Sequence, residues 1–523
     1  MATIIFDSVQ TPAGSLVFDT PAAPDPTPIA RTVSDDDFAA WLKSDDAITN
    51  ILVETWALVN GVRTPFFWST NGYTTEGTTY PVFYAPVIGT SIPFEEALSL
   101  TGAAALSAGD IEIDNTNGVN EHYARYIWAD EIVAVVGDVR WSRADYREIF
   151  VGHTAGLVRK GTRAFALRLR DMMEGLNYPL SEKKFGGTGP NADTLIPLTF
   201  GECCNASGEW SVASALERQW HDGPIEGIAE LRANGLPITE QAIVSDSTGK
   251  AVLSVNNETA TITATVQGDK FGGVFRTTIA TLIQRFITGY GKDLGRYGLV
   301  NIDAANFAEF DAAHQQPVGL HVRESVNVID ACDMLASSLG AQVAPSLNGK
   351  LQLIQIALPA AGEATEIRAE HMIKGTLRHV QHIEPIAAVK LGYCRNWTPQ
   401  PGLQTRLPAA HKALFEKEWP LTVTRTNPDT KRAYKLPGDA AMRGTMLLRG
   451  ADAAAEGNRL IALWGPGRDI YEFDGVSDLL MLKKGQRLVV YHEQDGMAQG
   501  VEAQVLEITR DWWTRVVKVR FLK

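Results

Sequence analysis

The stretch Ile51–Thr70, ILVETWALVNGVRTPFFWST, holds the clearest turn signal of the sequence. Two runs rich in β-branched and aromatic residues flank the dipeptide Asn60-Gly61. This dipeptide favours a two-residue hairpin turn, because both residues adopt positive φ at low cost. We therefore predict an antiparallel hairpin here and, around it, a β-rich domain.

Strand signals continue on both sides of this hairpin and return near the C-terminus. Short strands separated by Gly, Asn and Asp are typical of barrels and sandwiches. In order, the further predicted strands are TTYPVFYAPV, DIEIDN, EIVAVVGDVRW, YREIFVGHTAGLV, AFALRLRD, IAAVKLGYC, GQRLVVYHE, VEAQVLEIT and RVVKVRF, the last two joined by the turn RDWWT.

Helical periodicity dominates the middle of the chain. Apolar residues recur at helical spacing in TTIATLIQRFITGYG and in SVNVIDACDMLASSLG, where Gly340 is the predicted stop. The segment AQVAPSLNGKLQLIQI predicts a hairpin turning at Asn348-Gly349. Further helices are predicted in SDDDFAAWLKSD, with Ser34 as the N-cap, and in AAMRGTMLLRGADAAAEGNRLIALWG. The predicted fold class is mainly β with an α/β middle.

At 523 residues the chain is too long for one core, and domains usually span roughly 100–200 residues. The run PAAPDPTP predicts an extended arm, because proline cannot donate backbone hydrogen bonds. The predicted domains are an extended N-terminal arm at 1–40, a first barrel or sandwich domain at 41–205, a β-rich connecting domain at 206–260, an α/β domain at 261–378 and a second barrel or sandwich domain at 379–523.

Composition excludes several classes of protein. The net charge of −13 argues against nucleic-acid binding, which needs clustered Lys and Arg. No apolar run approaches the roughly 20 residues that span a bilayer, so no stable membrane insertion is expected. The N-terminus lacks the pattern of a signal peptide, and we expect synthesis in the cytoplasm. Four cysteines are too few for a disulfide scaffold and too scattered for a CxxC-type metal site.

Motifs of catalysis are missing from the sequence, which contains no GxSxG, HExxH, GxxxxGK[ST] or GxGxxG pattern. The Gly-rich FGGTGPN lacks the lysine of a phosphate loop and is interpreted as a solvated loop. Of three grouped histidines, His379 and His382 lie in the strand-like segment KGTLRHVQHIEPIAAV, which would put them on opposite faces. The histidines considered are His371, His379 and His382, and we predict that His379 and His382 diverge. The carboxylates considered are Asp35 to Asp37 and Glu95-Glu96, which we interpret as solvated faces with one helix N-terminus.

The cysteines are predicted to be structural. In LTFGECCNASGEW, the neighbours Cys203 and Cys204 follow a strand-like run, and adjacent strand residues point to opposite faces. Two ligands that point apart do not clamp one metal, and a vicinal disulfide is strained. Cys332 lies on the apolar stripe of its helix, and Cys394 lies at the end of a strand. We therefore predict no catalytic, cofactor-binding or metal-binding residue, and no enzyme.

Several phrases, in their order, resemble the hub protein at the tail tip (baseplate) of long-tailed phages and gene transfer agents. The phrase IPLTFGECCNASGEW is similar to that family's P-x-x-FG-x-x-x-N connection at Pro197, Phe200, Gly201 and Asn205. The resemblance covers most of the chain from about residue 40, and its other phrases are VETWALVNGVRTPFFWSTNG, TTYPVFYAP, IEIDNTNG, VVGDVRWSRADYREIFVGHTAGL, FALRLRDMMEGLNYPL, SVNVIDACDMLASSLGAQVAPSLNGKLQLIQI, AAVKLGYCRNWTPQ and GQRLVVYHEQDGMAQGVEAQVLEITRDWWTRVVKVRF.

The resemblance implies a virion structural protein with two tail-tube-like β-barrels and a mixed α/β domain. It implies a homotrimeric ring that joins the sixfold tail tube to the threefold tip and helps to form the DNA conduit. The implied partners are the distal tail protein or tail tube, other baseplate proteins, tail fibres and the tape-measure protein. Some hubs carry a C-terminal iron–sulfur extension, which this sequence lacks, so no cofactor is expected. The acidic charge would suit a conduit wall that repels DNA, which is a hypothesis.

Two alternatives remain open at this stage. The first is a receptor- or carbohydrate-binding tail-tip protein, in which aromatic side chains stack on sugars. Packing in a core or interface is the competing interpretation of those rings. The second alternative is a muralytic enzyme, which would need a raised-pKa acid or a zinc triad that no segment offers. The aromatic candidates are Phe66, Phe67, Trp68, Tyr73, Trp512 and Trp513.

Overall fold

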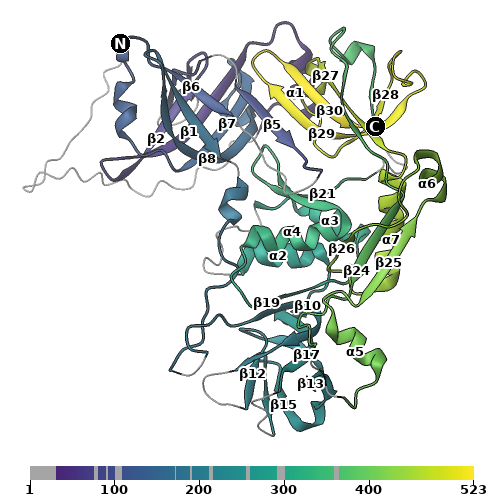
Figure 1. The fold of residues 1–523 in the computed structure, drawn as a ribbon. Helices are drawn as coiled ribbons and strands as arrows, with labels where there is room; N and C mark the ends of the chain where they lie inside the picture. The colour runs from purple at the N-terminus through teal and green to yellow at the C-terminus, as the bar shows by residue number, and fades with distance from the viewer. Residues whose placement is uncertain are drawn as a thin grey trace, which may run out of the picture.

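The computed structural model describes residues 31–523 apart from 76–80, 90–91, 101–108, 171, 189–190, 211–215, 255–259, 291–300, 358–363, 402 and 404. The predicted arm at 1–40 thus lies outside the described residues as far as residue 30. Two β-sheets lie side by side at one end of the molecule, helices fill the middle, and further sheets form the other end (Figure 1). No helix among the described residues is long and apolar enough to cross a membrane.

The first sheet grows from the predicted hairpin, which is confirmed. Val59 pairs with Val62, and the two turn residues between them, Asn60 and Gly61, have φ of 53° and 84°. These angles are those of the turn that matches the twist of a hairpin. In spatial order the sheet contains β3 (Tyr73–Thr74), β4 (Phe83–Pro86), β2 (Val62–Ser69), β1 (Thr49–Val59), β7 (Glu131–Asp138), β8 (Arg147–Lys160), β9 (Ala164–Arg170) and β6 (Asp110–Asp114).

The second sheet is assembled from distant parts of the chain. Its C-terminal hairpin turns at residues 512–515, which overlap the predicted turn RDWWT, and the Asp511 carboxylate accepts the backbone N–H of Trp513 at 3.0 Å. In spatial order the sheet contains β22 (Thr365–Ile367), β28 (Arg487–Val490), β29 (Val501–Asp511), β30 (Val516–Leu522), β27 (Arg468–Gly475) and β23 (Arg378–Ile383), and β5 (Pro93–Ala97) pairs with β29 from outside this path.

The chain is mainly β with several sheets, as predicted, but among the described residues no sheet is closed by a continuous ladder of strands. Single bridges nevertheless join distant strands of each sheet. In the first sheet, Ile88, just after β4, bridges Ile113 of β6, and Gly89 N donates to Glu112 O at 2.9 Å. In the second sheet, Met372, just after β22, bridges Gly475 at the end of β27. The barrels expected from the resemblance are therefore not confirmed by the strand pairing of the described residues.

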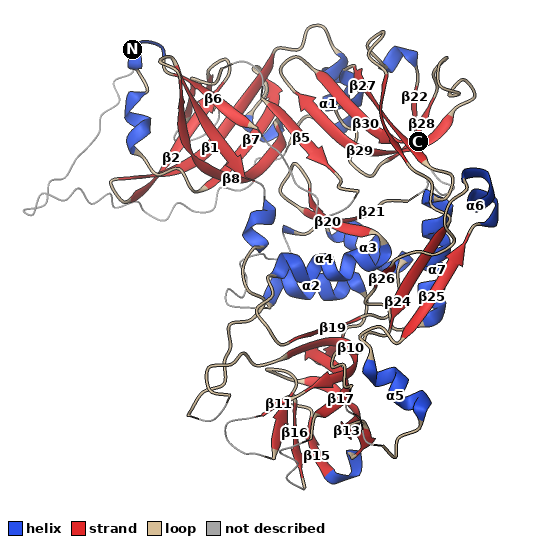
Figure 2. Cartoon of the chain, in the orientation of Figure 1, coloured by secondary structure: helices blue, strands red, loops and turns tan. Residues whose placement is uncertain are grey.

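The helical middle matches its sequence patterns. The predicted N-cap Ser34 accepts the backbone N–H of Asp37 at 3.1 Å, and Gly340 follows α4 and its short extension at φ 61°. The hairpin at Asn348-Gly349 is also confirmed. Figure 2 shows α2 to α4 as one blue layer between the upper and lower sheets. The helices are α1 (Asp35–Lys43), α2 (Ile279–Gly289), α3 (Ala304–Ala313), α4 (Val328–Ala336), α5 (Ala409–Glu416), α6 (Pro428–Tyr434) and α7 (Gly450–Trp464), and the hairpin is β20 (Ala341–Pro345) with β21 (Leu351–Gln355).

The helix predicted across residues 440–465 is shorter than its sequence pattern. Its first part is a strand, Met442–Gly444, which pairs in parallel with Ala388–Tyr393. Close packing explains the difference: a Cβ at Gly444 would overlap the Trp419 ring. The strands of this sheet are β25 (Leu421–Thr426), β24 (Ala388–Tyr393) and β26 (Met442–Gly444).

At the far end of the molecule, β10 (Leu198–Ser207) is an inner strand of a third sheet. It pairs with β17 (Ile262–Phe271) on one side and with β19 (Gly319–Val322) on the other. This strand, which the sequence analysis put at the end of the first domain, thus has its partners in another sheet. The remaining strands are β13 (Ile225–Ala233), β14 (Leu236–Pro237) and β18 (Val274–Phe275) in this sheet, and β11 (Glu209–Trp210), β12 (Glu217–Gln219), β15 (Ala242–Ser245) and β16 (Lys250–Leu253) in a fourth.

A buried ion pair fastens the first sheet's part of the chain to the second sheet. Glu96 of β5 is 4% exposed, and its Oε2 accepts a hydrogen bond from Arg510 Nη1 of β29 at 2.7 Å. Its Oε1 accepts the backbone N–H of Leu347, in the β20–β21 turn, at 3.1 Å. The prediction of a solvated face at Glu95-Glu96 was therefore wrong for Glu96. The reason is that pairing of β5 with β29 turns Glu96 into a core that both sheets share.

We predict that Glu96→Ala strongly destabilises the chain, because it leaves the Arg510 guanidinium buried without its carboxylate. Removal of one partner from a buried ion pair costs about 3–5 kcal/mol. Urea denaturation followed by tryptophan fluorescence measures the effect as a lower midpoint.

Glu95→Ala is the matched control, because Glu95 is half-buried on the other face of the same strand. Its effect should stay within about 0.5 kcal/mol, as for most surface substitutions. Equal midpoints for the two variants would contradict the structural role of the ion pair.

Candidate functional site

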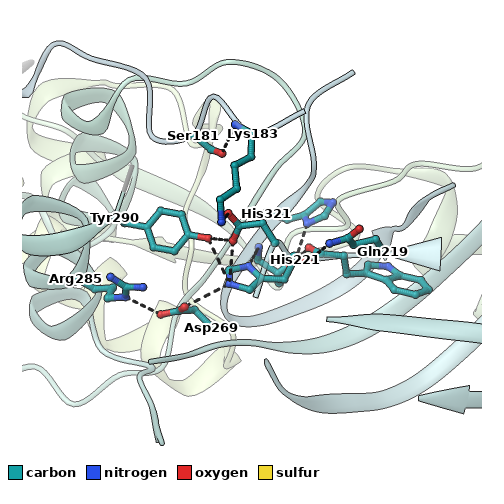
Figure 3. A network of polar contacts seen from close by, with 11 residues as sticks. Ser181, Lys183, Gln219, His221, Asp269, Arg285, Tyr290 and His321 are labelled. Carbon is teal, nitrogen blue, oxygen red and sulfur yellow. Dashed lines mark hydrogen bonds and ion pairs between the residues drawn. The ribbon is translucent and has the colours of Figure 1, made fainter. Parts of the chain in front are cut away.

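Buried ionisable side chains gather where the third sheet meets helix α2 (Figure 3). The cluster consists of His221, Asp222, Asp269, Arg285 and Tyr290, which contribute to the lining of a cavity of about 590 Å³. His221 is 1% exposed and Asp269 is 4% exposed. Because buried charges are costly unless they are paired, the partners of these groups decide what the cluster can do.

Local packing explains why these groups converge. Asp269 lies on β17 directly after Gly268, where a Cβ would overlap the carbonyl oxygen of Thr199 on β10. Glycine therefore lets the two strands approach closely at this point. On the other side, the Phe200 ring contacts Tyr290, just after α2, with ring centroids 4.9 Å apart. The strand and the end of the helix are thus held against the same stretch of β10.

The hydrogen bonds define the protonation pattern of the His221 ring. Thr199 N donates to His221 Nδ1 at 3.2 Å, so Nδ1 is an acceptor. The ring proton is then on Nε2, which lies 3.3 Å from Asp269 Oδ1. Arg285 Nε donates to the other carboxylate oxygen of Asp269 at 2.9 Å. Burial raises the pKa of Asp269, but the hydrogen bonds from His221 and Arg285 outweigh burial and hold it below its usual value.

A second carboxylate completes the network. Tyr290 donates its hydroxyl proton to Asp222, and Lys183 Nζ lies 3.0 Å from Asp222 Oδ2. Burial, together with the charge of Asp222, raises the pKa of Tyr290 well above its usual value. The phenol therefore remains a proton donor at neutral pH. The Arg285 guanidinium lies over the same ring, 4.6 Å from its centroid.

Another histidine lies behind this network. The Thr199 hydroxyl donates to Trp220 O at 2.8 Å and lies 3.0 Å from His321 Nδ1. Burial, with a smaller effect of the nearby Arg323 charge, lowers the pKa of His321 to about 3. His321 is thus neutral in the physiological range.

A phenol beside an imidazole is a pair of groups used in proton transfer. Here the protons of both groups point to carboxylates of the same network, and those carboxylates are also held by Lys183 and Arg285. The arrangement therefore acts chemically as a clamp that ties β17, α2 and the segment after β12 together. Among the described residues no group of three or more His, Cys, Asp or Glu side chains is placed to hold a metal ion.

The sequence analysis did not find this network. Its members come from segments up to 107 positions apart, from Lys183 to Tyr290, and no spacing rule links them. The available signal was weak: a His-Asp pair after a short strand and an Asp directly after Gly268.

The two neighbouring cysteines lie in different surroundings. Cys203 is fully buried in the third sheet's core, and burial raises its pKa. Cys204 points the other way, as expected for adjacent strand residues, and its Sγ lies 3.0 Å from Sγ of Cys394. Cys332 is fully buried on the α4 stripe. The proximity of Cys204 and Cys394 had no signal in the sequence, because 190 positions separate them.

The prediction that His379 and His382 diverge was wrong. A register shift in β23 between His379 and Gln381 breaks the alternation of faces. Both rings reach the carboxylate of Asp469, with His379 Nε2 at 3.0 Å and His382 Nδ1 at 2.8 Å from Oδ1. His371 lies apart from them and accepts the backbone N–H of Arg368 at 3.0 Å.

The aromatic candidates for sugar stacking pack inside. Trp68, Tyr73 and Trp512 are 1%, 8% and 5% exposed. Phe66, Phe67 and Trp513 are partly buried against the same cores. In the Gly-rich FGGTGPN stretch, Phe185 is buried, and residues 189–190 lie outside the described residues. Asp35 to Asp37 form the first turn of α1, as predicted.

Comparison with known proteins finds solved structures of phage tail proteins, the class that the sequence resemblance named. No protein-family model and no curated protein matches the chain. A tail protein from Neisseria meningitidis MC58 is 9% identical over 91% of this chain and 97% of its own, with a TM-score of 0.37. The 43 kDa tail protein of prophage MuSo2 from Shewanella oneidensis is 10% identical over 90% and 98%, with a TM-score of 0.37.

A chain from the virion of a native gene transfer agent particle is 12% identical over 65% of this chain and 86% of its own, with a TM-score of 0.41. At these TM-scores the likeness carries no argument about function.

We predict that Asp269→Asn lowers stability at neutral pH by about 2 kcal/mol, because it weakens charged hydrogen bonds to His221 and Arg285. The depressed pKa of Asp269 gives stability that is present above the unfolded pKa of about 4 and lost as pH falls through the folded value. The difference in thermal midpoint between wild type and variant should thus shrink on acidification below about pH 4.

Asp246→Asn, at an exposed position after β15, is the control and should leave the midpoint unchanged. If the difference in thermal midpoint between wild type and Asp269→Asn stays constant from neutral to acidic pH, the Asp269 charge does not act through this network.

Proposed function

We propose that the chain is a structural protein of the phage virion, the hub of the tail tip. In this proposal each chain supplies two tail-tube-like barrels, and three chains form a ring of six. The ring joins the sixfold tail tube to the threefold tip and surrounds the DNA path. The sequence phrases that resemble the hub family are the first support for this assignment.

The observation that carries the proposal is the pair of β-sheets that lie side by side at one end of the molecule (Figure 1). The segment 87–89 contacts β2 on one side, through Ile88 N to Ser69 O at 3.2 Å, and β6 on the other, through Asp114 N to Val87 O at 2.7 Å. The backbone hydrogen bonds of the first sheet can therefore be followed around a complete ring, which supports a barrel.

In the second sheet, too, the segment after one strand reaches a distant strand of the same sheet. Its strand β22 pairs with β28, and the segment 371–373 that follows β22 reaches β27 through Ile373 N to Asp474 O at 2.7 Å. Both sheets thus have a contact between distant strands, which supports the proposal of two tube-like units in one chain.

The interiors of both sheets are filled by apolar side chains. Phe150 and Phe165 of the first sheet, and Phe473 and Phe521 of the second, are at most 1% exposed and belong to one core. Such packed barrels contain no pore. In the proposed assembly the DNA conduit consequently runs between chains, along the axis of the ring. The net charge of −13 fits a wall that repels DNA.

We propose domain borders where the sheets change rather than at the residues predicted from sequence. The first barrel then spans about 49–170, and the strands β10 to β19, without the helices α2 and α3, form the far end. The second barrel combines β22 and β23 with 468–522 and the inserted β5, whereas β24 to β26 and α7 form a separate unit.

The proposed partners are those of a hub: two further copies, the distal tail protein or tail tube, other baseplate proteins with tail fibres, and the tape-measure protein. The alternative of a receptor- or carbohydrate-binding protein is favoured by no observation, because the aromatic rings that suggested it lie in the two cores.

We predict that antibody against this chain, viewed by immunogold electron microscopy, labels only the tail tip of intact phage particles. Purified chain analysed by mass photometry should show a species of three times the 56.9 kDa chain mass. An antibody against a capsid protein serves as the control for label position.

Particles that lack the protein would overturn the virion assignment itself. Label spread along the tail, or a purified species of any order other than three, would leave a tail protein but overturn the hub.

A further inference from the structure

Two cysteines from distant strands meet beside the centre of β10. Cys204 Sγ and Cys394 Sγ lie 3.0 Å apart, and both thiols are free. Both residues are partly exposed, unlike Cys203 and Cys332, so a small reagent can reach them. The sulfurs need to approach by only about 1 Å to reach the length of a disulfide bond.

Hydrogen bonds hold the two segments together on either side of the sulfurs. Trp397 N donates to Cys204 O at 3.3 Å, and Cys204 forms a single bridge with Asn396. Asn205 Nδ2 donates to Asn396 Oδ1 at 2.7 Å and to Thr398 O at 2.9 Å. The sulfurs are therefore positioned by contacts that do not require a covalent bond.

The backbone at Cys394 is itself unusual. Its φ is 51°, in the left-handed region that residues other than glycine rarely adopt, and its N–H donates to Leu447 O at 2.8 Å. A residue held there marks a place where the surrounding structure imposes the conformation. Here that conformation aims the thiol at Cys204.

We propose that Cys204 and Cys394 are a site of oxidative cross-linking, at which a small-molecule disulfide converts the two thiols into an intrachain disulfide. The Cys394 thiolate attacks one sulfur of the reagent, which forms a mixed disulfide and releases one thiolate. The Cys204 thiolate then attacks Cys394 Sγ and expels the second. Two electrons pass to the reagent, and the two thiol protons end on the two released small thiols.

The environment assigns these roles. The hydrogen bond from the Cys204 thiol lowers the pKa of Cys394, although burial opposes it, whereas the same hydrogen bond and burial raise the pKa of Cys204. The more readily ionised thiol is the better first nucleophile at neutral pH.

The bond would join β10 of the third sheet to the end of β24, and so connect the far end of the molecule to the unit that contains α7 (Figure 1). The time at which the cross-link forms rests on the proposed function: it forms after the particle leaves the reducing host cytoplasm. The thiol chemistry itself does not depend on the proposed function.

The test uses the purified full-length chain, reduced and then incubated with oxidised glutathione under native conditions. After quenching with N-ethylmaleimide and denaturation, the free cysteines, which are alkylated, and the disulfide-bonded cysteines, which are released only by reduction, are counted separately. Peptides are then mapped by mass spectrometry. We expect the free thiols to fall from four to two, with one cross-linked peptide pair that contains Cys204 and Cys394. These two thiols should be lost at least about tenfold faster than the two buried ones.

Cys394→Ala should abolish the cross-linked pair, and Cys332→Ala, at a buried helix position, should leave it unchanged. Four alkylated cysteines after prolonged oxidation, or a pair that joins Cys203 to Cys204, would overturn the proposal. The wild-type peptide map decides the question even where a variant fails to fold, and it is independent of where the chain lies in a particle.

Discussion

The insertion of β5 into the second sheet is the constraint on which the upper half of this structure depends. The strand leaves the first sheet's part of the chain, pairs with β29, and buries Glu96 against Arg510 at 2.7 Å. A buried carboxylate is tolerated only where its charge and its lone pairs are satisfied, and Leu347 N supplies a further donor. This one side chain therefore connects β5, β29 and the β20–β21 turn.

That connection makes the two upper sheets one body. Phe94 of β5 stacks on Phe150 of β8 with ring centroids 5.3 Å apart, so the same strand that pairs with the second sheet packs into the first. From the other side, Arg515 Nη1 donates to Ser44 O at 2.8 Å, just after α1. The two sheets therefore share a continuous apolar core.

The lower half depends on β10 instead. Gly268 and Gly319 lie against its backbone, where a Cβ on either would overlap a β10 carbonyl oxygen. The close approach puts two sets of polar or reactive groups around one strand: the His221 network near its start and the sulfurs of Cys204 and Cys394 further along it. The first set is internally neutralised and ties the layers together, whereas the second has a thiol chemistry that remains open to reagents.

The sequence by itself determined what depends on neighbours along the chain. The Asn60-Gly61 turn, the Ser34 cap and the Gly340 stop are all local, because positive φ and capping are properties of a few consecutive residues. The alternation rule also separated Cys203 from Cys204 correctly. It failed at His379 and His382, because a register shift, which is invisible in the pattern, brought both rings to Asp469.

Only the tertiary structure decided which distant segments meet. Glu96 reads as a solvated acid until β29 lies beside it, 414 positions away. His221 and Asp269 acquire their roles from the approach of two strands and a helix, and Cys204 meets Cys394 across 190 positions. Burial and pairing are properties of the packed chain, and the free energy that fixes them comes from contacts that no local pattern records.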